Sequence, residues 1–207
     1  SYQAPLHQYL CGGGKRAIEI AHRRWGKDEI ALAWTFQALT DRPATYWHCL
    51  PQLNQARKAI WTAVNPHTGK RRIDEAFPVE LREVTNEQEM FIRFLNGATW
   101  QVIGSDTYDS LVGAGVAGIV FSEWALANPS AWGYLSPMMR ENNGWALFIT
   151  TPRGKNHAYD MFNHAMKSDD WYAEISNAQA TGAFSDEQLD GIRDEYVALY
   201  GKDFGSS

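Results

Sequence analysis

The sequence contains no long apolar run, and nothing in its 207 residues approaches the roughly 18 consecutive apolar residues that a membrane-spanning helix needs. It has only two cysteines, Cys11 and Cys49, and their spacing fits no metal-ligand motif. Two cysteines in a chain of this length build no disulfide framework, so we expect reduced thiols. The first residues, 1–3, have neither the basic flank nor the apolar stretch of a signal peptide. We therefore expect a protein that is not secreted and acts in a cytosol-like setting, away from membranes.

The chain also lacks an excess of basic residues. Its 19 Lys and Arg stand against 24 Asp and Glu, for a net charge of −5. This balance excludes a protein that coats nucleic acid through bulk positive charge, but it allows a local basic surface. The basic residues gather in three clusters, namely Arg23, Arg24 and Lys27; Lys70, Arg71 and Arg72; and Arg153 with Lys155. We interpret the middle cluster as a solvated loop.

The predicted elements alternate between strands and helices. Apolar patterning predicts strands over 16–20, 45–50, 118–121, 145–149 and 171–177, and helices over 29–39, 52–64, 156–166 and 186–200. Segments 89–95 and 99–103 flank Asn96-Gly97, the strongest short signal for a hairpin, which we place as an insertion or at an edge. With 44% hydrophobic residues, the chain fits one sizeable α/β domain with a mainly parallel central sheet flanked by helices.

Polar residues follow two of the apolar strands. The run 118–121 ends at Ser122-Glu123, and the run 145–149 ends at Thr150-Thr151. Continuous apolar runs indicate strands that are buried on both faces. An open α/β sheet binds its ligands at the carboxyl ends of its strands, so these residues are candidates for a site.

Gly26-Lys27 lies between a predicted strand and a predicted helix, which is typical of a phosphate-binding loop. Backbone amides at a helix start cradle phosphate oxygens, and the lysine reaches the β- and γ-phosphates. The match is incomplete, because Ala21 replaces the usual first glycine and Asp28 replaces the usual Ser or Thr. Glu123 lies where such ATPases carry the carboxylate that orients the attacking water. The lysine loop and the glutamate together predict an ATP-hydrolysing P-loop domain.

On these residues the sequence resembles the large terminase subunit of tailed bacteriophages, the motor that packages DNA into the procapsid. The resemblance covers essentially the whole chain. It rests on four segments, namely Pro5 with Gln8, like the adenine-reading segment; 23–27, like the arginine-bearing Walker A; 119–123, like Walker B; and 150–152, like the coupling motif.

The resemblance implies a P-loop NTPase fold of the RecA-like ASCE type. It also implies Mg²⁺-dependent ATP hydrolysis that drives double-stranded DNA into the procapsid. The implied partners are the portal protein, the small terminase subunit and further copies of the chain, in a ring on the procapsid and as a monomer in isolation. The implied location is the host cytoplasm.

The resemblance further implies a role for each candidate residue. Lys27 would contact the β- and γ-phosphates, Glu123 would polarise the water, and Gln8 would read adenine. Arg23 would contact phosphate or sense its loss. The nucleotide-binding set is completed by Arg24, Trp25, Gly26 and Asp28. For Trp25 and Trp124 we favour core packing over stacking on a ligand.

Thr150 and Thr151 would relay the γ-phosphate state to the parts that grip DNA, the alternative being that they cap the turn after their strand. The family commonly uses in trans an arginine that precedes Walker B, but 111–113 holds none. Arg93, Arg140 and Arg153 remain unranked alternatives.

Two departures from the family pattern are reciprocal. Asp28 stands where a Ser or Thr is usual, and Ser122 stands where an Asp is usual. The exchange keeps one hydroxyl and one carboxylate beside the metal. We hypothesise that Asp28 supplies the carboxylate for Mg²⁺ and that Ser122 hydrogen-bonds it or holds a metal-bound water. The alternative is that Asp28 only favours the N-terminus of the helix dipole.

We interpret residues 1–207 as the ATPase motor domain. The family's RNase H-like nuclease domain would lie outside these residues, so we expect no nuclease activity from them. Two other functions remain open. One is another ASCE ATPase, of the helicase or recombination type. The other is a nucleotide-dependent interaction module without turnover, which the extra charge of Asp28 beside the phosphates keeps open.

Overall fold

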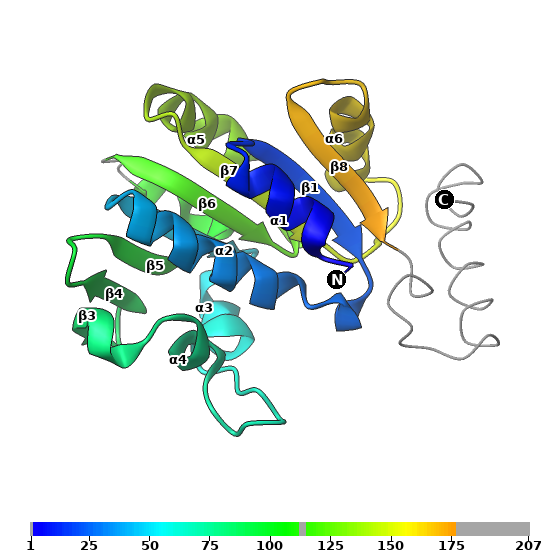
Figure 1. Cartoon of the computed structure of the whole chain (residues 1–207). Coiled ribbons are helices and arrows are strands. Elements are labelled where there is room, and N and C mark those ends of the chain that lie inside the picture. The colour runs from blue at the N-terminus through cyan, green and yellow to red at the C-terminus, as the bar shows by residue number, and fades with distance from the viewer. Residues whose placement is uncertain (1, 112–114, 177–207) are drawn as a thin grey trace.

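One eight-stranded sheet organises the chain (Figure 1), in the order β3-β4-β5-β2-β6-β7-β1-β8. The structure is a computed structural model, and it describes residues 2–111 and 115–176. The strands are β1 Arg16–Ala21, β2 Thr45–Leu50, β3 Arg82–Asn86, β4 Phe91–Phe94, β5 Thr99–Gly104, β6 Val116–Ser122, β7 Trp145–Thr150 and β8 Trp171–Ser176. The α-helices are α1 Ala4–Cys11, α2 Lys27–Asp41, α3 Leu53–Ala56, α4 Arg72–Ala76, α5 Ser130–Glu141 and α6 His157–Met166.

The sheet is mainly parallel, as the sequence predicts. Every neighbouring pair from β5 across to β8 is parallel, while β3, β4 and β5 pair antiparallel at one edge. The predicted hairpin is confirmed as β4 and β5, with Gly97 in the turn at φ +91°. Because β5 also pairs with β2, this hairpin belongs to the sheet and extends its edge. The strand that precedes the phosphate loop, β1, is separated from β6 by β7.

Helices cover both faces of the sheet and enclose two cores. Figure 1 shows α1 and α2 on one face and α5 and α6 on the other. In β7, Leu147 packs in the first core and Phe148 in the second. Since successive side chains of a strand point to opposite faces, both have to be apolar when both faces are covered. This explains the continuous apolar runs.

Four of these helices and strands were not predicted from the sequence: α1, α4, α5 and β3. Helix α5 contains Gly133 and Pro137, which both disfavour a helix interior, yet Ala131, Leu135 and Met139 bury one side of it. Helix α1 is short, and edge strand β3 is mostly exposed. The helix predicted over 52–64 is shorter, because α3 passes into a π-helical turn that ends at Trp61. The helix predicted over 186–200 lies outside the described residues.

Two expectations from composition concern the whole chain. Among the described residues, no helix is long and apolar enough to cross a membrane. Cys11 and Cys49 are both free thiols, the first exposed and the second buried.

Glu19 on β1 is a fully buried acid. It lies opposite Glu174 on β8 and accepts a hydrogen bond of 2.6 Å from Ser176 Oγ. Burial raises the pKa of Glu19 well above its ordinary value, and the charge of Glu174 raises it further. The folded chain therefore holds a proton that the unfolded chain releases at lower pH.

This buried acid predicts a loss of stability as pH rises. The stabilisation is complete below the unfolded pKa and is lost as pH increases through the raised folded pKa. Glu19→Gln cannot ionise, so it should flatten the dependence of the thermal midpoint on pH between about pH 5 and about pH 8. Thermal unfolding across this range tests it. The exposed Glu83→Gln on β3 is the control, and the same pH slope in wild type and Glu19→Gln would contradict the prediction.

Candidate nucleotide-binding site

The carboxyl ends of the parallel strands meet at one edge of the sheet, which we call the carboxyl edge. A cavity of about 410 Å³ opens there. Its lining consists of residues from the loop after β1, from α2, from the segment after α3, from the start of α4 and from the segments that follow β6 and β7, namely Arg23, Lys27, Asp28, Glu29, Ala59, Ile60, Arg72, Glu123 and Arg153. Segments distant in sequence thus form one site, at the position where open α/β sheets bind ligands.

The loop after β1 has the backbone that a phosphate-binding turn needs. Residues Arg23–Trp25 form a short 3₁₀ turn, Gly26 has φ +82°, and α2 begins at Lys27. Glycine suits this left-handed conformation, and a Cβ at Gly26 would approach Gln3 Nε2 to 2.7 Å and displace that amide. The loop thus ends at a helix N-terminus, whose unpaired amides favour an anion.

Gln3, which directly precedes α1, hydrogen-bonds the backbone of the phosphate-binding loop. Its Nε2 donates to the carbonyls of Trp25, at 2.8 Å, and Gly26, at 3.3 Å. The side chain of Trp25 is fully buried and lies edge-on to Tyr2. Of the predicted nucleotide-binding set, Trp25 can therefore contribute only its backbone, which agrees with the preference for core packing.

Lys27 is buried, and its ammonium lies across the loop. Its Nζ donates to the carbonyls of Ala21, at 3.1 Å, and His22, at 2.9 Å. Burial lowers the pKa of Lys27, and the nearby carboxylates of Glu123 and Asp28 oppose this shift. A phosphate would replace two neutral acceptors by charged ones, which make stronger hydrogen bonds.

Asp28 lies beside Ser122, across the gap between α2 and β6. Ser122 Oγ donates to Asp28 Oδ1 at 2.8 Å. The fully buried His48 of β2 places Nε2 3.3 Å from the same oxygen, at an angle that does not make a regular hydrogen bond. Burial alone would raise the pKa of Asp28, but His48, Ser122 and Lys27 outweigh it and hold the pKa below its ordinary value. Asp28 is thus a carboxylate at neutral pH.

Both partners contact one oxygen of Asp28. Among the described residues, Oδ2 accepts no hydrogen bond. A carboxylate oxygen and a hydroxyl are hard oxygen ligands of the kind that Mg²⁺ prefers, usually with substrate phosphates and water. Asp28 and Ser122 therefore fit Mg²⁺, although their metal role stays a prediction.

Glu123 directly follows β6 and has a left-handed backbone conformation, with φ 51° and ψ 49°. A non-glycine residue rarely adopts this conformation, and such strain gathers at functional sites. Thr151 Oγ1 donates to Glu123 Oε2 at 3.3 Å. Thr150 Oγ1 instead accepts from the amide of Ala125 at 3.2 Å and donates to the carbonyl of Thr151. Thr150 therefore hydrogen-bonds the backbone of the 3₁₀ turn that follows Glu123, while Thr151 contacts the predicted catalytic glutamate itself.

Gln8 does not join this group, and its adenine-reading role stays a prediction. Its side chain is exposed and lines a different cavity, at the opposite end of β1. Helix α1 runs away from the phosphate loop, so a residue in its middle lies far from that loop, and Gln3 at its start makes the contact. Arg24 is exposed and does not line the carboxyl-edge cavity. Gln3, and not Gln8, is the glutamine that contacts the phosphate loop.

The arginines divide between separate places. Arg23, Arg72 and Arg153 line the carboxyl-edge cavity, and Arg72 also pairs with Glu29. Arg140 lines the other cavity, and Arg93 lies over Phe91 on the exposed edge. Arg72 belongs to the cluster that we expected to be a solvated loop, and no local pattern could have placed it beside Lys27, which is far away in the sequence. His48 was likewise missed, because a histidine within an apolar strand looks like core.

The fold and these side chains define a P-loop nucleotide-binding domain of the RecA-like ASCE type. No protein-family model matches the chain. It is 28% identical over 163 residues to the terminase large subunits of Thermus phage G20c and Thermus virus P23-45, a match that covers 72% of the chain and 33% of each relative. The chain thus spans about a third of the length of these curated relatives. Over this span the chain is similar to the terminase large subunits, in line with the resemblance seen in the motifs.

Solved structures agree on the fold. The large terminase ATPase domain of Thermus phage P74-26 matches with a TM-score of 0.72 and 19% identity, over 96% of this chain and 87% of that one. The large terminase of another thermophilic bacteriophage, in complex with ATP-γ-S, matches with a TM-score of 0.67 and 13% identity, over 99% and 50%. The N-terminal domain of the DNA packaging ATPase of bacteriophage phi29 matches with 0.59 and 15%, over 83% and 95%.

The contact between Gly26 and Gln3 generates a prediction about the loop itself. Gly26→Ala should destabilise the fold by about 2 kcal/mol. About half of this loss would come from the left-handed backbone and the rest from displacing the Gln3 amide from its two carbonyls. Thermal or denaturant unfolding measures it. Gly69, with φ +72° and open space around it, is the matched control. A loss in Gly26→Ala no larger than that in Gly69→Ala would contradict the role of Gln3.

Proposed function

We propose that this chain is the ATPase domain of a viral DNA-packaging motor, which hydrolyses ATP with Mg²⁺ to move double-stranded DNA. One observation carries the proposal. Lys27, Asp28 and Glu123 line one cavity at the carboxyl edge, and Thr151, directly after β7, hydrogen-bonds Glu123. The similarity to terminase large subunits supports the packaging role. The portal protein, the small terminase subunit, a ring of copies and a nuclease domain outside residues 1–207 belong to the same proposal.

Each residue would have a distinct task in hydrolysis. The amides that begin α2 would bind the phosphates, and the Lys27 ammonium would exchange the carbonyls of Ala21 and His22 for β- and γ-phosphate oxygens. Glu123 would orient a water for in-line attack on the γ-phosphorus. Thr151 would hold the glutamate in place and respond to its movement after phosphate is released. Arg23 would stabilise charge on the phosphates, with Arg72 and Arg153 also within the cavity.

Asp28 would hold Mg²⁺, with Ser122 fixing the orientation of the carboxylate. When bound, Mg²⁺ supplies positive charge that offsets the charge developing on the phosphate oxygens. Ser122 and His48 both restrain Oδ1, which would leave Oδ2 for the cation. This would also remove the objection that Asp28 repels ATP, because the carboxylate and the phosphates would share one cation.

Turnover and binding together test the proposed ATPase activity. Lys27→Ala should weaken nucleotide binding about 10- to 100-fold, because charged hydrogen bonds to phosphate are lost. Glu123→Gln should retain binding and lower turnover about 100- to 10,000-fold, because the carboxylate that directs the water is gone. Calorimetry with ATP-γ-S and a phosphate-release assay measure the two quantities.

The exposed Glu83→Gln is the control and should change neither quantity. Turnover that survives in Glu123→Gln would contradict the assignment of the glutamate. Tight nucleotide binding by a wild type without turnover, alone and at concentrations that favour rings, would favour the interaction module.

The exchange of Asp28 and Ser122 makes a separate prediction about Mg²⁺. In wild type, Mg²⁺ should strengthen the binding of ATP-γ-S. Asp28→Asn should remove at least about tenfold of that gain, because a neutral amide binds the cation weakly. Calorimetry with and without Mg²⁺ gives the difference directly.

A double-mutant cycle sharpens this test. Asp28→Ser combined with Ser122→Asp restores the more common order of the two groups and should recover part of the Mg²⁺ effect that each single substitution loses. His48→Asn, which keeps a polar group behind Asp28, should lose less than His48→Ala. Full Mg²⁺ enhancement in Asp28→Asn would sink the hypothesis and leave Asp28 as a helix-dipole residue.

A further inference from the structure

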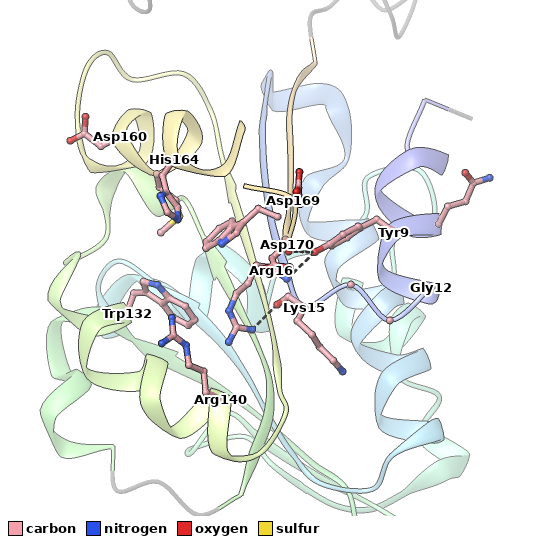
Figure 2. A pocket seen from close by; sticks show the side chains of 15 residues that line it. Tyr9, Gly12, Lys15, Arg16, Trp132, Arg140, Asp160, His164, Asp169 and Asp170 are labelled. Atoms are coloured by element: carbon pink, nitrogen blue, oxygen red, sulfur yellow. Dashed lines mark hydrogen bonds between the residues drawn. The ribbon is translucent and has the colours of Figure 1, made fainter. Parts of the chain in front are cut away.

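A second cavity, of about 1140 Å³, lies where β1 and β8 begin, at the end of the sheet opposite the nucleotide site (Figure 2). We call this end the amino edge. Lys15, Arg16, Trp132 and Arg140 contribute to its lining, and none of them belongs to the carboxyl-edge cavity. The proposed ATPase activity leaves this cavity without a function.

Four basic residues gather around one turn at this edge. Arg42 donates to the carbonyl of Asn142 at 2.7 Å, and Arg16 donates to the carbonyl of Gly144 at 2.8 Å. Arg140 lies in the last turn of α5, directly before this turn, and Lys15 precedes Arg16. We call Lys15, Arg16, Arg42 and Arg140 the amino-edge basic patch.

The patch has no neutralising carboxylate. Within residues 2–111 and 115–176, none of its four members forms an ion pair with Asp or Glu. Burial lowers the pKa of Lys15, and the charges of Arg42 and Arg16 lower it further; the pKa of Arg16 is likewise lowered by burial and then by Arg140. The four cations thus repel one another, in a chain whose net charge is −5. An anion would relieve that repulsion.

The side chains of the amino-edge basic patch differ in how firmly the fold holds them in place. Arg16 is fixed, because its guanidinium bonds two carbonyls and lies 5.1 Å from the ring centroid of Trp132. In the described structure, the side chains of Lys15 and Arg140 make no hydrogen bond. Lys15 and Arg140 therefore remain able to bind a ligand without first breaking a contact of the fold.

The three acidic residues of the cavity lie in two places: Asp160 lies away from the basic patch, whereas Asp169 and Asp170 lie near Arg16 (Figure 2). Asp160 comes from α6, and Asp169 and Asp170 come from the segment before β8. Figure 2 shows Asp160 on the far side from Lys15, while Arg16 and Arg140 lie together beside Trp132. A fitting anion would run along the basic side and leave the α6 wall free, so an extended polyanion suits the site better than a compact ion inside the cavity.

We propose that the amino-edge basic patch binds the phosphodiester backbone of double-stranded DNA. This inference rests on the proposed function, which supplies the class of polyanion. Duplex DNA presents one charge per about 1.7 Å of its axis, so a row of cations can contact successive phosphates without reading bases. The patch and the nucleotide cavity lie at opposite ends of the sheet, so DNA and ATP can be bound together.

Binding of a fluorescent DNA duplex, measured by anisotropy over a series of salt concentrations, tests the proposal. Lys15→Gln/Arg140→Gln removes the two cations whose side chains make no hydrogen bond or ion pair within the described residues, and it keeps Arg16 and Arg42. It should weaken binding at low salt at least about tenfold and reduce the slope of log K against log salt by about 2. Equal affinity and equal slope in the variant and wild type would overturn the proposal, as would absence of salt-dependent binding in wild type.

The control is Lys70→Gln/Arg93→Gln, which removes the same charge from exposed positions elsewhere, and an equal loss there would also overturn the proposal. Tripolyphosphate and poly-glutamate serve as competitors at equal charge concentration. If either displaces DNA from wild type as well as unlabelled duplex does, the patch is a general anion site and the assignment to DNA is wrong.

Calorimetry with ATP-γ-S separates this inference from the proposed function. Lys15→Gln/Arg140→Gln should bind the nucleotide as wild type does, which also shows that the variant is folded. Loss of DNA binding with intact nucleotide binding supports the patch. Failure of the ATPase tests at Lys27 and Glu123 would instead count against the proposed function.

Discussion

The hydrogen bond from Ser122 to Asp28 is the constraint around which the nucleotide site is arranged. It joins the first turn of α2, which carries the phosphate loop, to the end of β6, which carries Glu123. The buried His48 approaches the same carboxylate oxygen from β2. A carboxylate beside phosphates repels them unless a cation is shared, so a bound nucleotide would need a metal at this position or would bind more weakly. The orientation of Asp28 favours the first.

Strand β7 provides the second connection between the phosphate-binding loop and Glu123. It lies between β1 and β6, so its carboxyl end places Thr150 and Thr151 between the phosphate loop and Glu123. The two threonines differ in role because adjacent side chains of an extended chain point in opposite directions. Thr150 faces inward and caps the segment that starts at Ala125, whereas Thr151 reaches the glutamate. A shift of Glu123 would therefore first change its hydrogen bond with Thr151. It would then change the hydrogen bond between the Thr151 carbonyl and the Thr150 hydroxyl.

Sequence patterns predicted the parallel strands because burial on both faces forces continuous apolar runs, as in 118–121 and 145–149. They predicted the hairpin because Asn96-Gly97 satisfies a local turn requirement. They missed α5, where burial of Leu135 and Met139 outweighs the local cost of Gly133 and Pro137. The site was predictable where chemistry follows a strand end, as at Lys27 and Glu123, but not where tertiary structure brings in a distant side chain, as with Arg72 and His48. Gln8 shows a further limit of prediction from sequence motifs. Locating a motif on a helix says nothing about which end of that helix meets the loop, and here Gln3 does.

Helix α1 contacts the phosphate loop at its start and approaches the basic patch at its end. Gln3 holds the carbonyls of Trp25 and Gly26, while Tyr9 Oη accepts from the amide of Arg16 and donates to the carbonyl of Asp170. Leu6 and Leu10 anchor the helix in the core. Two ligands become coupled only when an element between them makes different contacts in each liganded state, and the coupling is then equal in both directions. A nucleotide that moved the loop carbonyls would act on Gln3, and α1 is the element that connects Gln3 to Tyr9 and, through it, to the backbone of Arg16.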